Sequence, residues 1–204
     1  MKLIHLKYIF ILLMLSSFAV KAQSDTSLIF LKSIDSTIVI DVKYATTDNF
    51  THTILYATDK VYLRLAAAKQ LAKANQLFKE KYGYRIKVFD GYRPLSVQKF
   101  MWKVTPDKNY VANPAVGSKH NRGAAVDCTL IDSTGAELEM GTSYDSFTEK
   151  AHSNNPNISA KAKSNRKLFK QVMGKFGFRQ IDNEWWHFDF KGWARYSILD
   201  IEIK

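Results

Sequence analysis

The sequence predicts an α+β fold, with one domain in which helices flank a central, mainly antiparallel sheet. Two long segments carry apolar residues at helical spacing, and short segments of alternating apolar and polar residues lie between and after them. Tight turns connect several of the short segments, as in antiparallel hairpins. No internal repeat or low-complexity linker divides the 204 residues, so one domain is predicted over residues 23–204.

The helical spacing predicts helices over residues 59–82 and 159–176. Asp59 is a candidate N-cap and Gly83 a candidate C-cap of the first helix, and Gly177 is the expected C-terminal cap of the second. A shorter helix is expected over residues 97–102, with Ser96 as its cap.

The strand pattern is clearest at residues 85–90, where apolar and polar residues alternate. The segment 124–131 is predicted as a further strand, with 136–140 returning beside it as a hairpin partner. The remaining strand segments are predicted at 28–31, 38–42, 178–181 and 185–190.

The first 22 residues have the pattern of a cleavable secretory signal peptide. Lys2 and Lys7 precede a short apolar run, and Val20 and Ala22 are small residues before a cleavage point. The run is short for a membrane span, so no stable membrane insertion is expected after cleavage. The alternative is an uncleaved anchor. The prediction is an exported protein, in the periplasm or, alternatively, secreted.

The formal charge is +11, and without the signal segment 27 basic and 19 acidic residues leave about +8. A basic exported protein is attracted to anionic envelope polymers. Nucleic acid is not an expected partner, because an exported protein does not meet it and the lysines are scattered. The single cysteine, Cys128, cannot form an internal disulfide and is expected to be a small buried apolar residue rather than a reactive thiol. The sequence indicates no particular oligomeric state.

His120 and Asp127 are candidate metal ligands that are seven residues apart. On a straight strand they would be roughly 23 Å apart and on opposite faces, so the chain must reverse between them. Gly123 is the expected reversal point because glycine tolerates positive φ. Cys128 then faces away from Asp127, which argues against it as a ligand.

Glu184 and His187 add a second carboxylate and a second imidazole. A bend at Asn183 and Glu184 is expected, because residues three apart on a strand face opposite ways. Two histidines and one aspartate are the ligand set of a catalytic zinc site with an open position, and Glu184 is then the base. Either pair alone is more often structural; the combination carries the prediction.

The motifs resemble a known family of zinc peptidases. The pattern Ser118-x-His120-x-x-Gly123-x-Ala125-x-Asp127 with Glu184-Trp-Trp-His187 is similar to the superfamily of D-alanyl-D-alanine metallopeptidases, lysostaphin and hedgehog. The segments 90–94 (DGYRP) and 41–50 (DVKYATTDNF) narrow the resemblance to the VanX-type D-Ala-D-Ala dipeptidases. It extends from about residue 38 to 190. Residues 51–53 (THT) depart from the Thr-Gly of many members.

The resemblance implies one Zn²⁺ per chain, held by His120, Asp127 and His187. It implies that Glu184 is the catalytic base and then the acid for the leaving amine. Arg93 matches the family's arginine for the transition state, where a guanidinium would stabilise the oxyanion.

The remaining implied site residues bind substrate. Asp145 matches the carboxylate that reads the substrate ammonium, and Tyr44 and Ser118 match pocket positions. For Tyr44 the alternative is packing alone, and for Ser118 a hydrogen bond within its loop. For Arg93 the alternative is a salt bridge with Asp90, which is compatible with a catalytic role.

The resemblance implies hydrolysis of the dipeptide D-Ala-D-Ala, a small-molecule substrate, to two D-alanines. The physiological setting would be cell-wall peptide metabolism or glycopeptide resistance. One alternative is a murein D,D-carboxypeptidase with the same chemistry. A second is a non-catalytic zinc module that binds the cell wall, although binding alone requires neither Glu184 nor Arg93.

Overall fold

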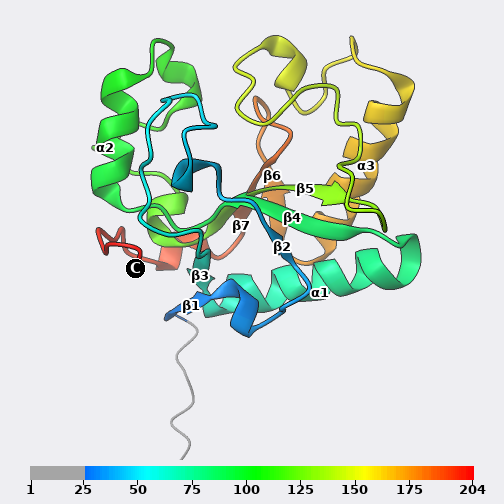
Figure 1. Ribbon diagram of the computed structural model, residues 1–204, viewed down its shortest axis with the longest axis horizontal. Helices are drawn as coiled ribbons and strands as arrows, with labels where there is room; N and C mark the ends of the chain where they lie inside the picture. The colour runs from blue at the N-terminus through cyan, green and yellow to red at the C-terminus, as the bar shows by residue number, and fades with distance from the viewer. Residues whose placement is uncertain (1–25) are drawn as a thin grey trace, which may run out of the picture.

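The computed structural model describes residues 26–204, and its centre is a five-stranded sheet with the order β2-β4-β5-β7-β6 (Figure 1). The pair β2–β4 is parallel and the other three pairs are antiparallel. The predicted α+β fold with a mainly antiparallel sheet is therefore confirmed. The strands are β2 (Val39–Ile40), β4 (Arg85–Asp90), β5 (Ala125–Ile131), β6 (Phe178–Gln180) and β7 (His187–Phe190).

Two helices, α1 (Leu65–Tyr82) and α3 (Ala160–Lys175), pack together against one face of this sheet. Phe169 of α3 lies between Phe78 of α1 and Phe188 of β7, with ring centroids 5.9 and 4.7 Å apart. Because side chains alternate along a strand, the neighbours of these core residues point to the opposite face. His187 and Asp127 are on that opposite face.

The third helix, α2 (Leu95–Val104), lies on the other side of the view from α3. Its first turn is joined to the C-terminal segment, since Leu95 N–H donates to the Leu199 carbonyl and Ser96 N–H to Asp200 Oδ1. The prediction that Ser96 caps this helix is wrong: the helix begins directly after Pro94, and Ser96 is in its first turn.

The prediction that Asp59 starts the first long helix is also wrong. Residues Tyr62–Arg64 form strand β3, which pairs antiparallel with β1 (Leu28–Phe30) in a small second sheet. Pairing across a distant strand overrides the local apolar pattern here. The end of the helix is confirmed, because Gly83 adopts φ 69° as its C-cap. The N-cap of α3 is Ser159, whose hydroxyl accepts from Ala162 N–H at 3.0 Å. The C-cap of α3 is Phe176 rather than the expected Gly177, which follows it with φ 82°.

The predicted strand over 136–140 is reduced to a single bridge between Ile131 and Glu137. Cys128 is buried, as expected. His52, at the position where the sequence departs from Thr-Gly, adopts φ 51°, the left-handed conformation that glycine tolerates best.

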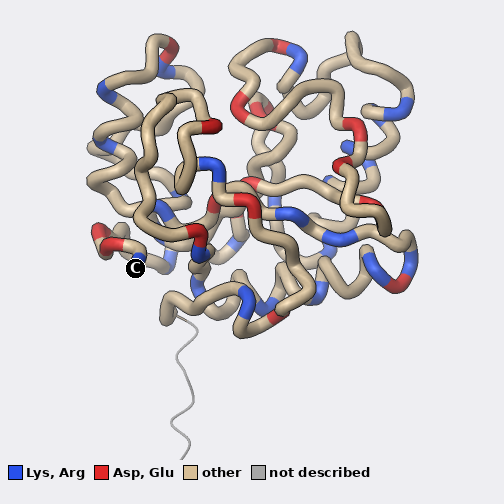
Figure 2. The backbone as a smooth tube through the Cα atoms, in the orientation of Figure 1, with Lys and Arg blue, Asp and Glu red and all other residues tan. Residues whose placement is uncertain are grey.

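Lysine and arginine residues are spread along the helices and connections (Figure 2), which agrees with the scattered lysines of the sequence. Within residues 26–204, no helix combines the length and the apolar character needed to cross a bilayer. The predicted signal segment, 1–22, lies outside the described residues.

Candidate active site

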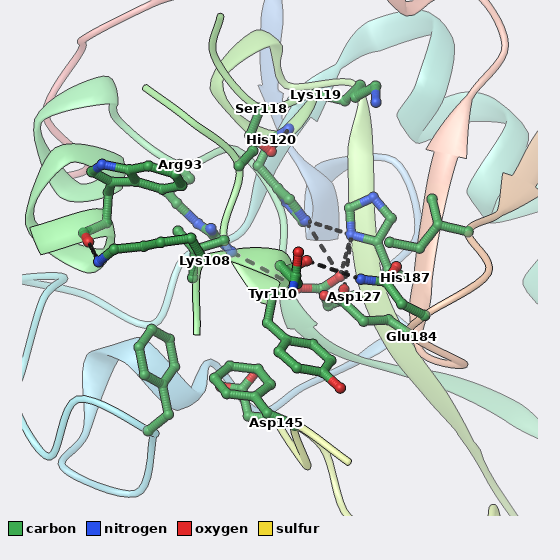
Figure 3. A pocket seen from close by; sticks show the side chains of 18 of the residues that line it. Arg93, Lys108, Tyr110, Ser118, Lys119, His120, Asp127, Asp145, Glu184 and His187 are labelled. Carbon is green, nitrogen blue, oxygen red and sulfur yellow. Dashed lines mark hydrogen bonds and ion pairs between the residues drawn. The ribbon is translucent and has the colours of Figure 1, made fainter. Parts of the chain in front are cut away.

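A cavity of about 460 Å³ opens on the face of the sheet that α1 and α3 leave uncovered (Figure 3). All the predicted site residues line it: Tyr44, Arg93, Ser118, His120, Asp127, Asp145, Glu184 and His187. The structure thus brings together residues that are more than 140 positions apart in the chain.

The chain reverses between His120 and Asp127 as the spacing requires. His120 begins a short 3-10 turn, His120–Arg122, and Gly123 closes the turn with φ 65°. A Cβ at Gly123 would lie 2.6 Å from Leu28 Cδ2, the end of a flexible side chain, so it is the positive φ that favours glycine here. Asp127 then follows on β5, opposite His187 of β7.

His120, Asp127 and His187 form one compact cluster whose ligand atoms all lie within 4.8 Å of one another. His120 Nε2 is 3.1 Å from His187 Nδ1, and Asp127 Oδ1 is 3.3 and 3.0 Å from these two nitrogens. The outer nitrogens are occupied: His120 Nδ1 is 2.6 Å from the Gly91 carbonyl, and His187 Nε2 is 2.9 Å from Asp189 Oδ1. Because both partners can only accept, those outer nitrogens carry the protons, and the inner ones present lone pairs.

This donor set fits a metal ion. Two imidazole lone pairs would repel at this separation, whereas ligand nitrogens on a tetrahedral zinc are about 3.3 Å apart. Asp127 Oδ1 is buried and receives no hydrogen bond of good geometry, although both imidazoles are near it. The zinc ligation expected from the sequence therefore has the residues it needs.

The charges of Asp127 and its neighbours also favour a positive charge within the cluster. Burial alone would raise the pKa of Asp127, but His120 and His187 more than offset it and hold the pKa well below its usual range. Burial alone would lower the pKa of His187, but the neighbouring carboxylates of Asp127 and Asp189 raise it to about 10. A proton or a metal ion can supply this charge, and the two compete.

Glu184 lies beside the cluster, with Oε2 3.8 Å from His187 Nδ1. The chain bends over residues 182–186 before β7 begins, so the expected bend is confirmed. Burial raises the pKa of Glu184 to about 7, against the lowering effect of His187. A carboxylate with a pKa near neutrality is suited to take up and return a proton.

The two tryptophans between Glu184 and His187 lie in different surroundings. Trp186 lines the cavity, with its ring 5.5 Å from that of Tyr144. Trp185 instead donates its indole N–H to Thr142 Oγ1 at 2.8 Å. Both are buried, so this packing fixes the bend that carries Glu184.

Arg93 follows β4 and is held in a fixed orientation. Its Nε and Nη2 donate to Asp90 Oδ2 at 3.0 and 2.7 Å, and its Nη1 donates to Gln98 Oε1 at 2.9 Å. The predicted salt bridge with Asp90 is therefore present. Nη2 also lies 3.9 Å from Asp127 Oδ2, so the guanidinium is beside the metal cluster. Burial would lower the pKa of Arg93, but Asp90 and other neighbours raise it, and it stays cationic.

Asp145 and Tyr44 line the cavity together, since the Tyr44 hydroxyl donates to Asp145 Oδ2 at 2.9 Å. Asp145 has φ 54°, an uncommon conformation for a residue other than glycine. Burial, reinforced by the charge of Asp127, raises the pKa of Asp145 well above its usual value. A cation placed near Asp145 would reverse that effect.

Ser118 lines the cavity and also hydrogen-bonds within its loop, which was the alternative for this residue. Its hydroxyl accepts from His120 N–H at 3.2 Å, and its own N–H donates to Asn121 Oδ1 at 2.7 Å.

Sequence reasoning missed several residues that orient the site. Asn121 is fully buried and donates to the Arg93 carbonyl at 2.9 Å, which joins the arginine turn to the histidine turn. The Tyr144 hydroxyl donates to Asp127 Oδ2 at 3.1 Å, leaving Oδ1 free for a metal. Asp189 holds His187. Of these three residues, only Asp189 could have been predicted from the sequence. It is two residues after His187, so on a strand its carboxylate lies on the same face as the ligand histidine and can hold the ring.

The sequence as a whole matches a known family. Residues 24–199 match the model of the peptidase family described as D-Ala-D-Ala dipeptidase. The match covers far more than half of the chain. The chain belongs to the D-Ala-D-Ala dipeptidase family.

Named members of the D-Ala-D-Ala dipeptidase family are similar to this chain along most of their length. A D-alanyl-D-alanine dipeptidase of Escherichia coli K12 is 36% identical over 178 residues, covering 87% of this chain and 92% of the relative. One of Enterococcus faecium is 33% identical over 172 residues, covering 72% and 83%. Among solved structures, VanYB in complex with D-Alanine-D-Alanine matches with a TM-score of 0.42 and 16% identity, over 68% of this chain and 77% of that one. A similarity of that level adds nothing to the assignment.

Membership of the D-Ala-D-Ala dipeptidase family confirms the resemblance drawn from the motifs. It also agrees with the geometry, because the described residues gather the donor set of a metallopeptidase, a buried carboxylate and a fixed arginine around one cavity.

Proposed function

We propose that this chain is a zinc-dependent dipeptidase that hydrolyses D-Ala-D-Ala to two D-alanines. The observation that carries the proposal is the cluster of His120, Asp127 and His187, whose inner atoms are free for one metal ion while their outer atoms are held. Glu184 beside that cluster adds a group that proton transfer needs and metal binding does not.

His120 Nε2, Asp127 Oδ1 and His187 Nδ1 would hold the ion. When bound, zinc supplies Lewis acidity, which polarises the peptide carbonyl and makes water a stronger acid. Gly91 and Asp189 fix the ring orientations of the two histidines, and Tyr144 fixes the carboxylate of Asp127. This preorganisation removes the need for the ligands to rearrange on binding.

Glu184 would accept the proton of the attacking water and pass it to the leaving amine nitrogen. Burial favours this role, because it brings the pKa of Glu184 to about 7. Arg93 would donate to the oxyanion that forms at the peptide carbonyl. A guanidinium has five N–H groups, and the bonds to Asp90 and Gln98 use three of them, so two remain.

The carboxylate of Asp145 would pair with the free ammonium of the dipeptide. A substrate cation would lower the raised pKa of Asp145 and strengthen the pair, which is the basis of recognition. Tyr44 holds Asp145 through its hydroxyl, and Ser118 is a cavity wall whose loop carries His120.

A kinetic comparison of three substrates tests this function: D-Ala-D-Ala, its N-acetyl form and a murein pentapeptide. The expected result is turnover of the free dipeptide alone, because the blocked form and the pentapeptide offer Asp145 no ammonium at the required place. Equal or better turnover of the pentapeptide would instead support a murein D,D-carboxypeptidase. Zinc binding without hydrolysis of any of the three would support a non-catalytic module.

We also propose that residues 1–22 direct export and are removed after Ala22, with the periplasm as the destination and peptidoglycan peptides as the source of substrate. The support is the pattern of the segment: two early lysines, an apolar run and small residues before the cleavage point. N-terminal sequencing of the protein recovered from a periplasmic fraction tests it. The expected first residue is Gln23, and a start at Met1 in the membrane fraction would contradict it.

A further inference from the structure

Arg166 of α3 is a buried arginine that pairs with backbone rather than with a carboxylate. Only 3% of the residue is exposed. Its Nε, Nη1 and Nη2 donate to the carbonyls of Met140, His152 and Lys150 at 2.7, 2.7 and 2.9 Å. None of the ion pairs formed among residues 26–204 includes it. Burial lowers its pKa to about 10, so it remains charged at neutral pH.

The three carbonyls are at the two ends of one loop. Met140 precedes the loop, and Lys150 and His152 follow it, so a single guanidinium closes the base of residues 141–149. The loop contains Asp145, which lines the cavity, and Tyr144, whose hydroxyl donates to the metal-cluster residue Asp127. Within residues 141–148 the loop has no helix or strand to hold its shape. Its conformation therefore depends on how its ends are fixed.

The backbone of Asp145 makes the loop conformation especially dependent on how the ends of the loop are fixed. Its φ of 54° is an uncommon conformation for a residue other than glycine, and it persists only where surrounding contacts determine it. If the base of the loop opened, the residue could return to a relaxed conformation and its carboxylate would leave the Tyr44 hydroxyl. The planar fork of arginine can reach three carbonyls at once, whereas lysine presents a single ammonium on a flexible chain.

A second contact ties the same arginine to the other side of the site. The Arg166 guanidinium carbon lies 5.7 Å from the centre of the Trp185 ring. Trp185 in turn donates to Thr142 in the loop and directly follows Glu184. The loop and the segment that carries the base are thus held to one support.

From this geometry we propose that Arg166 is a positioning residue that sets recognition of the substrate ammonium, by closing the base of the loop that presents Asp145. This inference rests on the proposed dipeptidase function and on the assignment of Asp145 to the ammonium. It predicts that replacing Arg166 weakens binding of the free dipeptide more than it weakens the metal cluster. The two ligand histidines are held from outside the loop, by Gly91 and Asp189, and Asp127 receives one hydrogen bond from the loop, from Tyr144.

A double-mutant cycle tests it, with kcat and KM measured on D-Ala-D-Ala for Arg166→Lys, Asp145→Asn and the pair. For Arg166→Lys alone, KM should rise about 10-fold and kcat should stay within about threefold of the wild-type value. When Arg166→Lys is added to Asp145→Asn, kcat/KM should fall by less than about twofold below that of Asp145→Asn alone. Zinc content should stay at one per chain. If the two losses multiply instead, Arg166 does not act through Asp145 and the inference is overturned.

Arg64 provides a matched control. It too is buried and donates to three carbonyls, those of Thr26, Arg122 and Ser197, but none belongs to the loop of Asp145. Any loss of kcat/KM caused by Arg64→Lys should multiply with the loss caused by Asp145→Asn in the double variant. Inactivity of the wild-type enzyme on the dipeptide would refute the proposed function; an active wild type with an additive Arg166 cycle would refute this inference alone.

Discussion

Asp90 lies opposite Asp127 in the pair of strands β4 and β5, because Phe89 is an extra residue in β4. The register pairs Val88 with Cys128 and then Asp90 with Asp127, so two steps along one strand match one step along the other. Without this bulge Asp90 would share the face of Val88 and point toward the helices. The bulge turns the carboxylate to the cavity face, where it holds Arg93.

Asp90→Asn should therefore weaken the site through Arg93. An amide has one acceptor oxygen, and it cannot serve both Arg93 and the opposite partners, Tyr56 O–H and Gly91 N–H. We expect kcat/KM to fall roughly 10- to 100-fold with zinc retained, as for partial loss of a transition-state donor. The control is Asp41→Asn, whose ion pairs with Lys43 and Lys87 are partly exposed and worth less than about 1 kcal/mol. Equal activity of both variants would contradict a role for Asp90.

Glu184→Gln should separate metal binding from hydrolysis. The amide keeps the size of the side chain but cannot accept the proton of water, so kcat should fall on the order of 1,000-fold. Zinc content, measured by atomic absorption, should be unchanged, because Glu184 Oε2 is 3.8 Å from the nearest ligand nitrogen. Survival of substantial activity would mean that another group is the base.

Asp189→Ala should weaken zinc binding although Asp189 is not itself one of the expected ligands. Asp189 holds the Nε2 proton of His187, and loss of such a partner typically costs about 10- to 100-fold in metal affinity. Competition with a chromophoric chelator measures this. Lys119→Met is the control and should have a smaller effect, because the Lys119 ammonium lies near Asp189 Oδ2, at 3.5 Å, and over the Trp193 ring but does not contact His187. A larger effect of the lysine variant would contradict the assigned role of Asp189.

Asp35 should contribute stability that depends on pH. Burial would raise its pKa, but hydrogen bonds from Thr37 and Asn75 outweigh burial and lower the pKa below 3.8. A depressed folded-state pKa stabilises the protein above the unfolded pKa and loses that effect as pH falls through the folded value. The urea midpoint of the wild type should exceed that of Asp35→Asn at pH 6, and the difference should shrink below about pH 3.8. A difference that does not change with pH would contradict this linkage.

Local sequence patterns predicted the parts of the molecule that local chemistry determines. The reversal at Gly123, the cap at Gly83, the position of α3 and the bend before His187 follow from backbone preference, apolar periodicity and strand alternation. The start of α1 was not predictable in this way, because residues 62–64 form a strand that pairs with the distant segment Leu28–Phe30. Site residues were predictable where motifs carry them. The roles of Asn121 and Arg166 could not be predicted, because these side chains donate hydrogen bonds to backbone carbonyls of distant segments. A sequence pattern does not show which distant carbonyl a side chain will reach.

The most direct test of a zinc dipeptidase is release of D-alanine from D-Ala-D-Ala by zinc-stripped protein to which zinc is added back. His120, Asp127 and His187 offer one set of inner ligand atoms, so activity should rise with added zinc and reach its plateau at one ion per chain. A chelator should abolish it. Activity that persists in the stripped protein, or no release of D-alanine at any zinc loading, would contradict the assignment.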